Sequence, residues 1–166
     1  MLKQLKSYRL LALFICIPLL AACQTTQETA NKAASRNKPV RDKHVASLVE
    51  KMARKHNVPT HIAHGVVKAE SNYRCNARNP RTGALGVMQT LPATARGVGV
   101  HGNLTDCETG MEAGMRYLKM ALERGGSGCE GISLYERGIY ASPKCTGYGQ
   151  KVLSYANDAK QDHFLR

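Results

Sequence analysis

Glu70 places an ionisable side chain among apolar neighbours, a combination that could support acid–base chemistry. In a helix predicted over residues 60–71, the apolar side chains share one broad face at 100° per residue, and Glu70 falls near the middle of it. Burial disfavours the charged form of a carboxyl group, and the negative end of the helix dipole acts in the same direction. We therefore expect a raised pKa, which suits a general acid near neutral pH. The alternative is a buried acid with a purely structural hydrogen bond.

The opposite face of this predicted helix carries His61, His64 and Lys68. Two histidines three residues apart could ligate a metal ion, but a polar face of this kind is typical of a solvated surface. We expect no metal site here.

From His44 onward the apolar residues keep helical spacing, and no stretch alternates as a run of strands does. A first helix ends near Asn57, and a long helix begins at a capping box formed by Thr105 and Glu108 and ends at Gly125. Further helices are predicted over residues 60–71, 92–97, 130–138 and 147–163. The predicted fold class is all-α.

The length and composition of the chain indicate a single, basic domain. A chain of 166 residues with 43% hydrophobic residues can form one core. Its 24 Lys and Arg against 12 Asp and Glu give a formal net charge of +12, which favours anionic partners. Nucleic acid is not the expected partner, because aromatic residues, on which bases could stack, make up only 5% of the chain. The N-terminal segment also predicts export, and an exported protein rarely meets nucleic acid.

The N-terminal segment has the features of a bacterial lipoprotein signal. A cationic stretch precedes an apolar run from Leu10 to Ala22 that is too short to span a bilayer as a mature helix. The run ends in Leu-Ala-Ala before Cys23, which resembles the lipobox where lipoprotein signal peptidase cleaves and the cysteine is acylated. In the alternative reading, the signal is an ordinary one and Cys23 has no role.

Three segments follow from this interpretation. Residues 1–22 form the signal peptide, residues 23–44 a polar, flexible tether, and residues 45–166 the folded domain. We expect the mature protein in the periplasm of a bacterial cell envelope, anchored by its lipid to the membrane, with the outer membrane favoured.

Four cysteines remain in the folded domain, an even number that predicts two disulfides in an oxidising compartment. A zinc site is the alternative, but the sequence has no Cys-x-x-Cys pair. Four cysteines allow three pairings, and the sequence alone does not choose among them. We favour Cys75–Cys107 and Cys129–Cys145.

Several motifs occur in the order found in one enzyme family. Glu70-Ser71 is followed by Gly86-Val87-Met88-Gln89, by Pro92-Ala93-Thr94-Ala95, by Gly114-Met115-Arg116-Tyr117-Leu118 and by a segment from Thr146 to Leu153. The region from about 45 to 157 thus resembles the lytic transglycosylase domain of the soluble type, a relative of goose-type lysozyme. That family reads Glu-Ser, then Gly-Leu-Met-Gln, then Pro-x-Thr-Ala.

The resemblance implies a lysozyme-like helical fold and cleavage of the β-1,4 bond between N-acetylmuramic acid and N-acetylglucosamine in peptidoglycan. In the family mechanism the acid at the position of Glu70 protonates the glycosidic oxygen. As a carboxylate it then deprotonates the C6 hydroxyl of the sugar, which attacks the anomeric carbon and leaves a 1,6-anhydro end. Neither a metal nor a cofactor is implied.

The resemblance also implies a set of substrate-binding positions: Ser71, Gly86, Val87, Met88, Gln89, Tyr135, Glu136 and Tyr148. We expect Ser71 and Tyr148 to hydrogen-bond the carboxyl group of Glu70. Alternatively, Ser71 could cap the end of the helix, and Met88 and Tyr148 could serve the core. Val87 replaces the leucine of the family. Tyr135-Glu136-Arg137-Gly138 stands where the family reads Tyr-Asn-Ala-Gly, so an acid occupies the asparagine position.

Two other functions stay open. A lysozyme-like hydrolase would use Glu136 or Asp106 to assist a water molecule. A non-catalytic peptidoglycan-binding lipoprotein, or an accessory of a secretion system, would have no need of an acid at position 70. The expected partners are peptidoglycan glycan strands, the membrane through the N-terminal lipid, and components of secretion or cell-wall synthesis.

Overall fold

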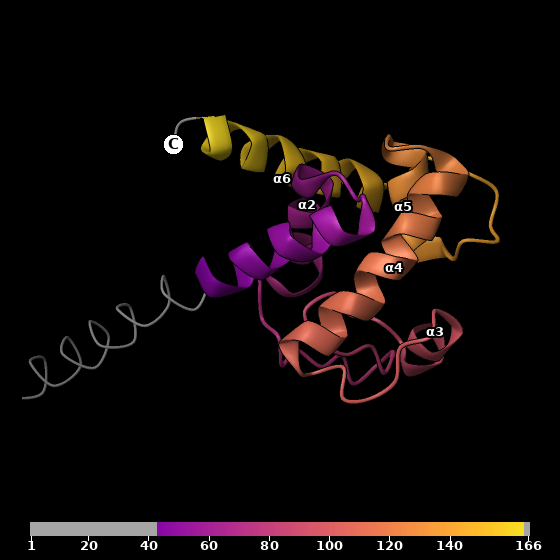
Figure 1. Cartoon of the computed structure of the whole chain (residues 1–166). Helices are drawn as coiled ribbons and strands as arrows, with labels where there is room; N and C mark the ends of the chain where they lie inside the picture. Colours follow the sequence, from indigo (N-terminus) through magenta and orange to yellow (C-terminus); the bar gives the residue numbers. More distant parts are fainter. Residues whose placement is uncertain (1–42, 165–166) are drawn as a thin grey trace, which may run out of the picture. The chain divides into compact units, whose positions relative to one another are not determined.

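The computed structural model describes residues 43–164, and this part of the chain is helical (Figure 1). The predicted signal peptide, the lipidation site at Cys23 and the tether up to residue 42 lie outside the described residues. The first helix already includes residues 43 and 44, which the sequence analysis had assigned to the tether. Among the residues described, no helix is both long and apolar enough to cross a bilayer.

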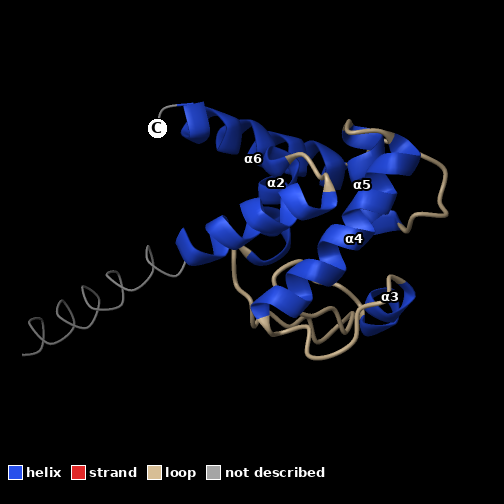
Figure 2. Ribbon diagram, in the orientation of Figure 1, coloured by secondary structure: helices blue, strands red, loops and turns tan. Residues whose placement is uncertain are grey.

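The described helices alternate with turns and loops (Figure 2). The prediction of an all-α fold is confirmed, because the part of the chain that is described holds only two isolated β-bridges besides helices. The helices comprise residues 43–56, α2 (Thr60–Ser71), α3 (Pro92–Gly97), α4 (Cys107–Gly125), α5 (Cys129–Arg137) and α6 (Gly147–Phe164).

The N-terminus of α4 differs from the predicted capping box. Asp106, and not Thr105, is the N-cap, and its carboxylate accepts a hydrogen bond of 2.9 Å from the backbone N–H of Thr109. The hydroxyl of Thr105 instead donates to the side chain of Asn103 at 2.8 Å. The cap is therefore one residue later than the sequence pattern suggested.

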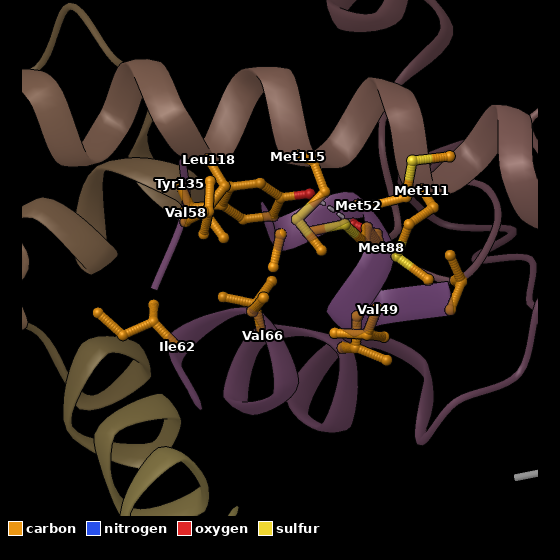
Figure 3. Close-up of a cluster of buried hydrophobic side chains, with 14 of the residues drawn as sticks. Val49, Met52, Val58, Ile62, Val66, Met88, Met111, Met115, Leu118 and Tyr135 are labelled. Carbon is orange, nitrogen blue, oxygen red and sulfur yellow. Dashed lines mark hydrogen bonds between the residues drawn. The ribbon is translucent and has the colours of Figure 1, made fainter. Parts of the chain in front are cut away.

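One core joins the helices around the site. Side chains from the helix over residues 43–56, from α2, α4 and α5, and from the segment before α3 pack together (Figure 3). Met111, Met115 and Leu118 of α4 are fully buried, so the methionines at helical spacing fill the core. Met88 and Val87 are fully buried as well, which fixes the segment that precedes α3 against the helices.

Helix α6 packs along α2, as Figure 1 shows, and α5 contacts both α4 and α6. The approach of α6 to α2 requires a glycine at position 65, because a Cβ atom there would lie 2.6 Å from the carbonyl oxygen of Val152. This close packing brings the start of α6 toward the end of α2, where Glu70 lies.

The favoured disulfide pairing is confirmed. Cys75–Cys107 connects the loop after α2 to the first residue of α4, with 4.8 Å between the two Cα atoms. Cys129–Cys145 connects the first residue of α5 to the segment just before α6, with 5.0 Å between the Cα atoms. Both bridges therefore brace loops that border the region around Glu70.

We predict that reduction of the disulfides lowers the Tm by about 10 °C or more, because cross-links closing loops of 32 and 16 residues contribute about 3 kcal/mol each. Calorimetry with and without reductant measures the shift. Alkylation of the four cysteines in the native protein, detected by the mass of their peptides, would contradict the assignment.

Candidate active site

Glu70 lines a cavity of about 660 Å³. The wall is formed by the end of α2, the segment from residue 79 into α3, the middle of α4, the end of α5 and the start of α6. The lining residues are Ala69, Glu70, Asn79, Thr82, Ala84, Gln89, Thr90, Leu91, Thr94, Tyr117, Tyr135, Glu136, Arg137, Gly138 and Tyr148. Carboxyl, amide and hydroxyl groups thus face one space together with apolar surface, an arrangement that suits sugar rings.

The hydroxyl of Tyr148 donates a hydrogen bond of 2.5 Å to Oε1 of Glu70. The expected contact between these two residues is therefore present. Tyr148 is the second residue of α6, and Glu70 lies in the last turn of α2, so the packing of these two helices makes the bond possible. Burial, followed by the nearby charge of Glu70, raises the pKa of Tyr148 well above its ordinary value, which keeps the phenol a hydrogen-bond donor.

The pKa of Glu70 is raised above its ordinary value, mainly because burial disfavours the charged carboxylate. The nearby carboxylate of Glu136 raises this pKa further, whereas the hydrogen bond from Tyr148 and the positive charge of Lys151 lower it. Burial prevails over the opposing effects. The site therefore favours a protonated carboxyl group that can still ionise.

Ser71 has a different partner from the one expected. Its buried hydroxyl donates to the carbonyl oxygen of Val87 at 2.7 Å and accepts from the backbone N–H of Arg74 at 3.1 Å. The expected bond to the carboxyl group of Glu70 is replaced by these two bonds. Ser71 thus fastens the cavity wall to the end of α2 and does not face the cavity.

The segment Gly86-Val87-Met88-Gln89 forms a tight turn, with backbone hydrogen bonds between Leu85 and Thr90 on either side. Gly86 has a φ of 81°, and a Cβ atom there would overlap the carbonyl oxygen of Leu104, so only glycine fits. Of the four turn residues, only Gln89 lines the cavity. Its side-chain amide donates to the carbonyl oxygen of Gly86 at 2.9 Å, which leaves the amide oxygen for a ligand.

Gly86, Val87 and Met88, which the resemblance places among the substrate-binding positions, do not line this cavity. All three are buried behind the turn. For Met88, the alternative of a core role is correct. Their contribution to the site is indirect, because their packing determines where Gln89 and Thr90 stand.

Tyr135 lines the cavity, but its hydroxyl is hydrogen-bonded within the protein. The hydroxyl donates to the carbonyl oxygen of Met88 at 2.8 Å. Burial, followed by the charge of Glu70, raises the pKa of Tyr135 far above its ordinary value. The phenol therefore fastens α5 to the turn, as Ser71 fastens α2 to it.

Glu136 and Arg137 both line the cavity, next to each other at the end of α5. Oε2 of Glu136 accepts from the hydroxyl of Thr146 at 3.5 Å, and Nη1 of Arg137 donates to the carbonyl oxygen of Ser142 at 2.7 Å. Among the described residues no ion pair joins the two side chains. Asp106, the other acid considered for a hydrolase, caps α4 and is not part of the wall.

Several lining residues were not predicted from the sequence. Asn79 and Thr82 belong to a turn in which the Asn79 side chain accepts hydrogen bonds from the backbone N–H groups of Arg81 and Thr82. Thr94 and Tyr117 lie on predicted helices but were not assigned to the site. The Asn-Pro-Arg-Thr-Gly composition signals a turn, yet no local pattern indicates which wall that turn will form.

The histidines of α2 remain outside the cavity. Nδ1 of His64 lies 2.9 Å from the hydroxyl of Tyr73, and the two rings pack together, so this side chain is half-buried and less solvated than expected. Burial lowers the pKa of His61. Among the described side chains of residues 43–161, no group of three or more His, Cys, Asp or Glu could hold a metal ion.

The comparison with known families agrees with this geometry. The family model described as "Transglycosylase SLT domain" matches residues 47–153, well over half of the chain. The match lies within the region from 45 to 157 in which the motif resemblance was found, and it contains every residue of the cavity wall.

We predict opposite changes in the pKa of Glu70 for two substitutions. Glu136→Gln removes a like charge and should lower this pKa, whereas Lys151→Gln removes an opposite charge and should raise it. Carbon NMR titration of the Glu70 carboxyl group measures both shifts. Glu130→Gln, which removes an acid of α5 outside the cavity wall, is the matched control and should leave the titration unchanged. Equal titrations in all four proteins would refute the electrostatic account.

Proposed function

Because the chain belongs to the transglycosylase SLT domain family, whose activity is the lytic cleavage of peptidoglycan, we propose that Glu70 carries out this cleavage as a single acid and base. The bond broken is the β-1,4 bond between N-acetylmuramic acid and N-acetylglucosamine. The product is a glycan strand ending in 1,6-anhydro-N-acetylmuramic acid.

One observation carries this proposal: the carboxyl group of Glu70 lines the cavity with a raised pKa and a hydrogen bond from Tyr148. Burial favours the neutral acid, the form of Glu70 that donates its proton at the start of the reaction. Tyr148 and Lys151 stabilise the carboxylate that forms once the proton has gone to the glycosidic oxygen. The same group can therefore donate a proton and then accept one.

In the second step the carboxylate accepts the proton of the C6 hydroxyl, and the oxygen of that hydroxyl attacks the anomeric carbon. The reaction consumes no water, and Glu70 ends it protonated, as it began. Tyr148 holds Oε1 in place during both steps, so Oε2 is the oxygen that exchanges the proton. Gln89 and the polar groups of Asn79 and Thr94 line the same wall and suit the hydroxyl and acetamido groups of the sugars.

A hydrolase is the second candidate function, because Glu136 lines the same cavity as Glu70. A second carboxylate could activate a water molecule as general base, or act as a nucleophile. Its contact with Thr146 and its place beside Arg137 favour a binding role instead. The products distinguish these two reactions.

Substitution of Glu70 by Gln preserves its size and hydrogen bonding but removes the proton that is transferred. We predict that Glu70→Gln reduces the clearing of purified peptidoglycan at least ~100-fold. Mass spectrometry of native digests should show fragments lighter by one water than hydrolysed fragments. Glu136→Gln should retain cleavage and give the same anhydro products.

Two results would overturn this assignment. Undiminished cleavage by Glu70→Gln would remove this residue from the mechanism. Hydrated, reducing muramic ends in native digests, together with an inactive Glu136→Gln variant, would identify a hydrolase with two carboxylates.

We also propose that the mature chain begins at an acylated Cys23 and works in the periplasm, held by its lipid to the membrane. The proposal rests on the Leu-Ala-Ala-Cys sequence after a cationic and then apolar segment. Lipid attachment would confine the enzyme to the envelope, where its basic surface meets an anionic polymer.

Replacement of Cys23 by Ser removes the thiol that carries the lipid. We predict that Cys23→Ser abolishes labelling by a fatty-acid probe and releases the protein from the membrane fraction. The matched control, Cys16→Ser, changes a cysteine inside the signal segment and should leave both labelling and fractionation unaltered. Membrane retention of unlabelled Cys23→Ser would count against the lipobox.

A further inference from the structure

Arg137 brings a positive charge to the wall of the cavity that holds Glu70. Among the side chains described, those of residues 43–161, no acidic group lies within ion-pair distance of it. The adjacent Glu136 contacts the hydroxyl of Thr146 instead. Although Glu136 lines the same cavity, the guanidinium of Arg137 is thus not in an ion pair with a carboxylate of the described side chains.

The guanidinium of Arg137 is held in place by the loop that connects α5 to α6 (Figure 2). Nη1 donates a hydrogen bond of 2.7 Å to the carbonyl oxygen of Ser142. That loop is itself fixed, because the backbone N–H of Ile139 donates to the hydroxyl of Tyr117 and Cys145 is bonded to Cys129. A guanidinium has five N–H donors in a planar fork, so this single anchor leaves donors for a ligand.

The position also sets this chain apart from the motif it resembles. Tyr135-Glu136-Arg137-Gly138 stands where that motif reads Tyr-Asn-Ala-Gly. Alanine offers neither charge nor a hydrogen-bond donor. The function of Arg137 is therefore separate from the bond cleavage that the motif serves.

We propose that Arg137 binds a carboxylate of the peptides carried by peptidoglycan, so that the cavity recognises the peptide as well as the sugars. This inference rests on the proposed function for the identity of the polymer. In intact strands the lactyl group of the muramyl residue is joined to the peptide by an amide bond, so the free carboxylates belong to the peptide. A guanidinium and a carboxylate can form two parallel N–H···O bonds, which neutral amides cannot match.

Binding is measured by calorimetry with two glycan oligomers, one carrying peptides with free carboxylates and one in which these groups are converted to amides. All proteins carry Glu70→Gln in the full chain, so that no oligomer is cleaved during the titration. The test variant, Arg137→Gln, loses the charge but keeps an N–H donor for the carbonyl oxygen of Ser142. Arg137→Lys keeps a charge without the planar fork.

Arg124→Gln is the matched control. Arg124→Gln and Arg137→Gln each remove an arginine from the last turn of a helix, but Arg124 does not line the cavity. A thermal melt of each variant checks that the fold is retained.

We expect Arg137→Gln to weaken binding of the carboxylate oligomer about fivefold and to leave binding of the amidated oligomer unchanged. Arg137→Lys should recover part of the loss, and Arg124→Gln should change neither affinity. Equal weakening of both oligomers, or of neither, would overturn the proposal.

Digestion of peptidoglycan by the native protein is scored separately, so the two proposals can fail independently. An inactive native protein whose binding still discriminates between the oligomers through Arg137 would refute the proposed function alone. An active protein without this discrimination would refute the carboxylate site alone.

Discussion

The carboxyl group of Glu70 is taken partly out of water, and the fold provides its partner from 78 residues away through the hydroxyl of Tyr148. A polar group in such a place needs a hydrogen bond, because an unpaired one costs free energy. The bond forms only if α2 and α6 pack closely, and Gly65 allows that approach. The contact that stabilises the end of α2 is therefore the same contact that tunes its acid.

The cavity wall opposite this pair depends on two further buried hydrogen bonds. Ser71 donates to the carbonyl oxygen of Val87, and Tyr135 donates to that of Met88, so α2 and α5 each hold one of two consecutive peptide groups. Such bonds are directional and fix the turn that presents Gln89. Ser71, Val87 and Met88 thus hold the turn in position, whereas Gln89 is the turn residue of the motif that lines the cavity.

Two charged side chains next to each other at the end of α5 line the cavity wall. Glu136 acts on Glu70 electrostatically, and Arg137 is anchored by the loop before α6. These two side chains stand where the motif that the chain resembles reads Asn and Ala. The residues that hold the turn and the residues that bring charge to the wall are therefore different ones.

Helix bounds, the apolar face that includes Glu70, and the even number of cysteines follow from the sequence by itself. Each depends on residues a few positions apart, and the helical period of 3.6 is a local property. Motif order likewise placed Glu70 and Tyr148 in one site. Other features are decided only by the tertiary structure. The hydroxyl of Ser71 bonds to Val87, and Asp106, not Thr105, caps α4. Asn79 and Thr94 line the cavity. Packing decides these contacts, because a side chain bonds to whichever partner the folded chain brings within about 3 Å, and that partner can lie far away in sequence.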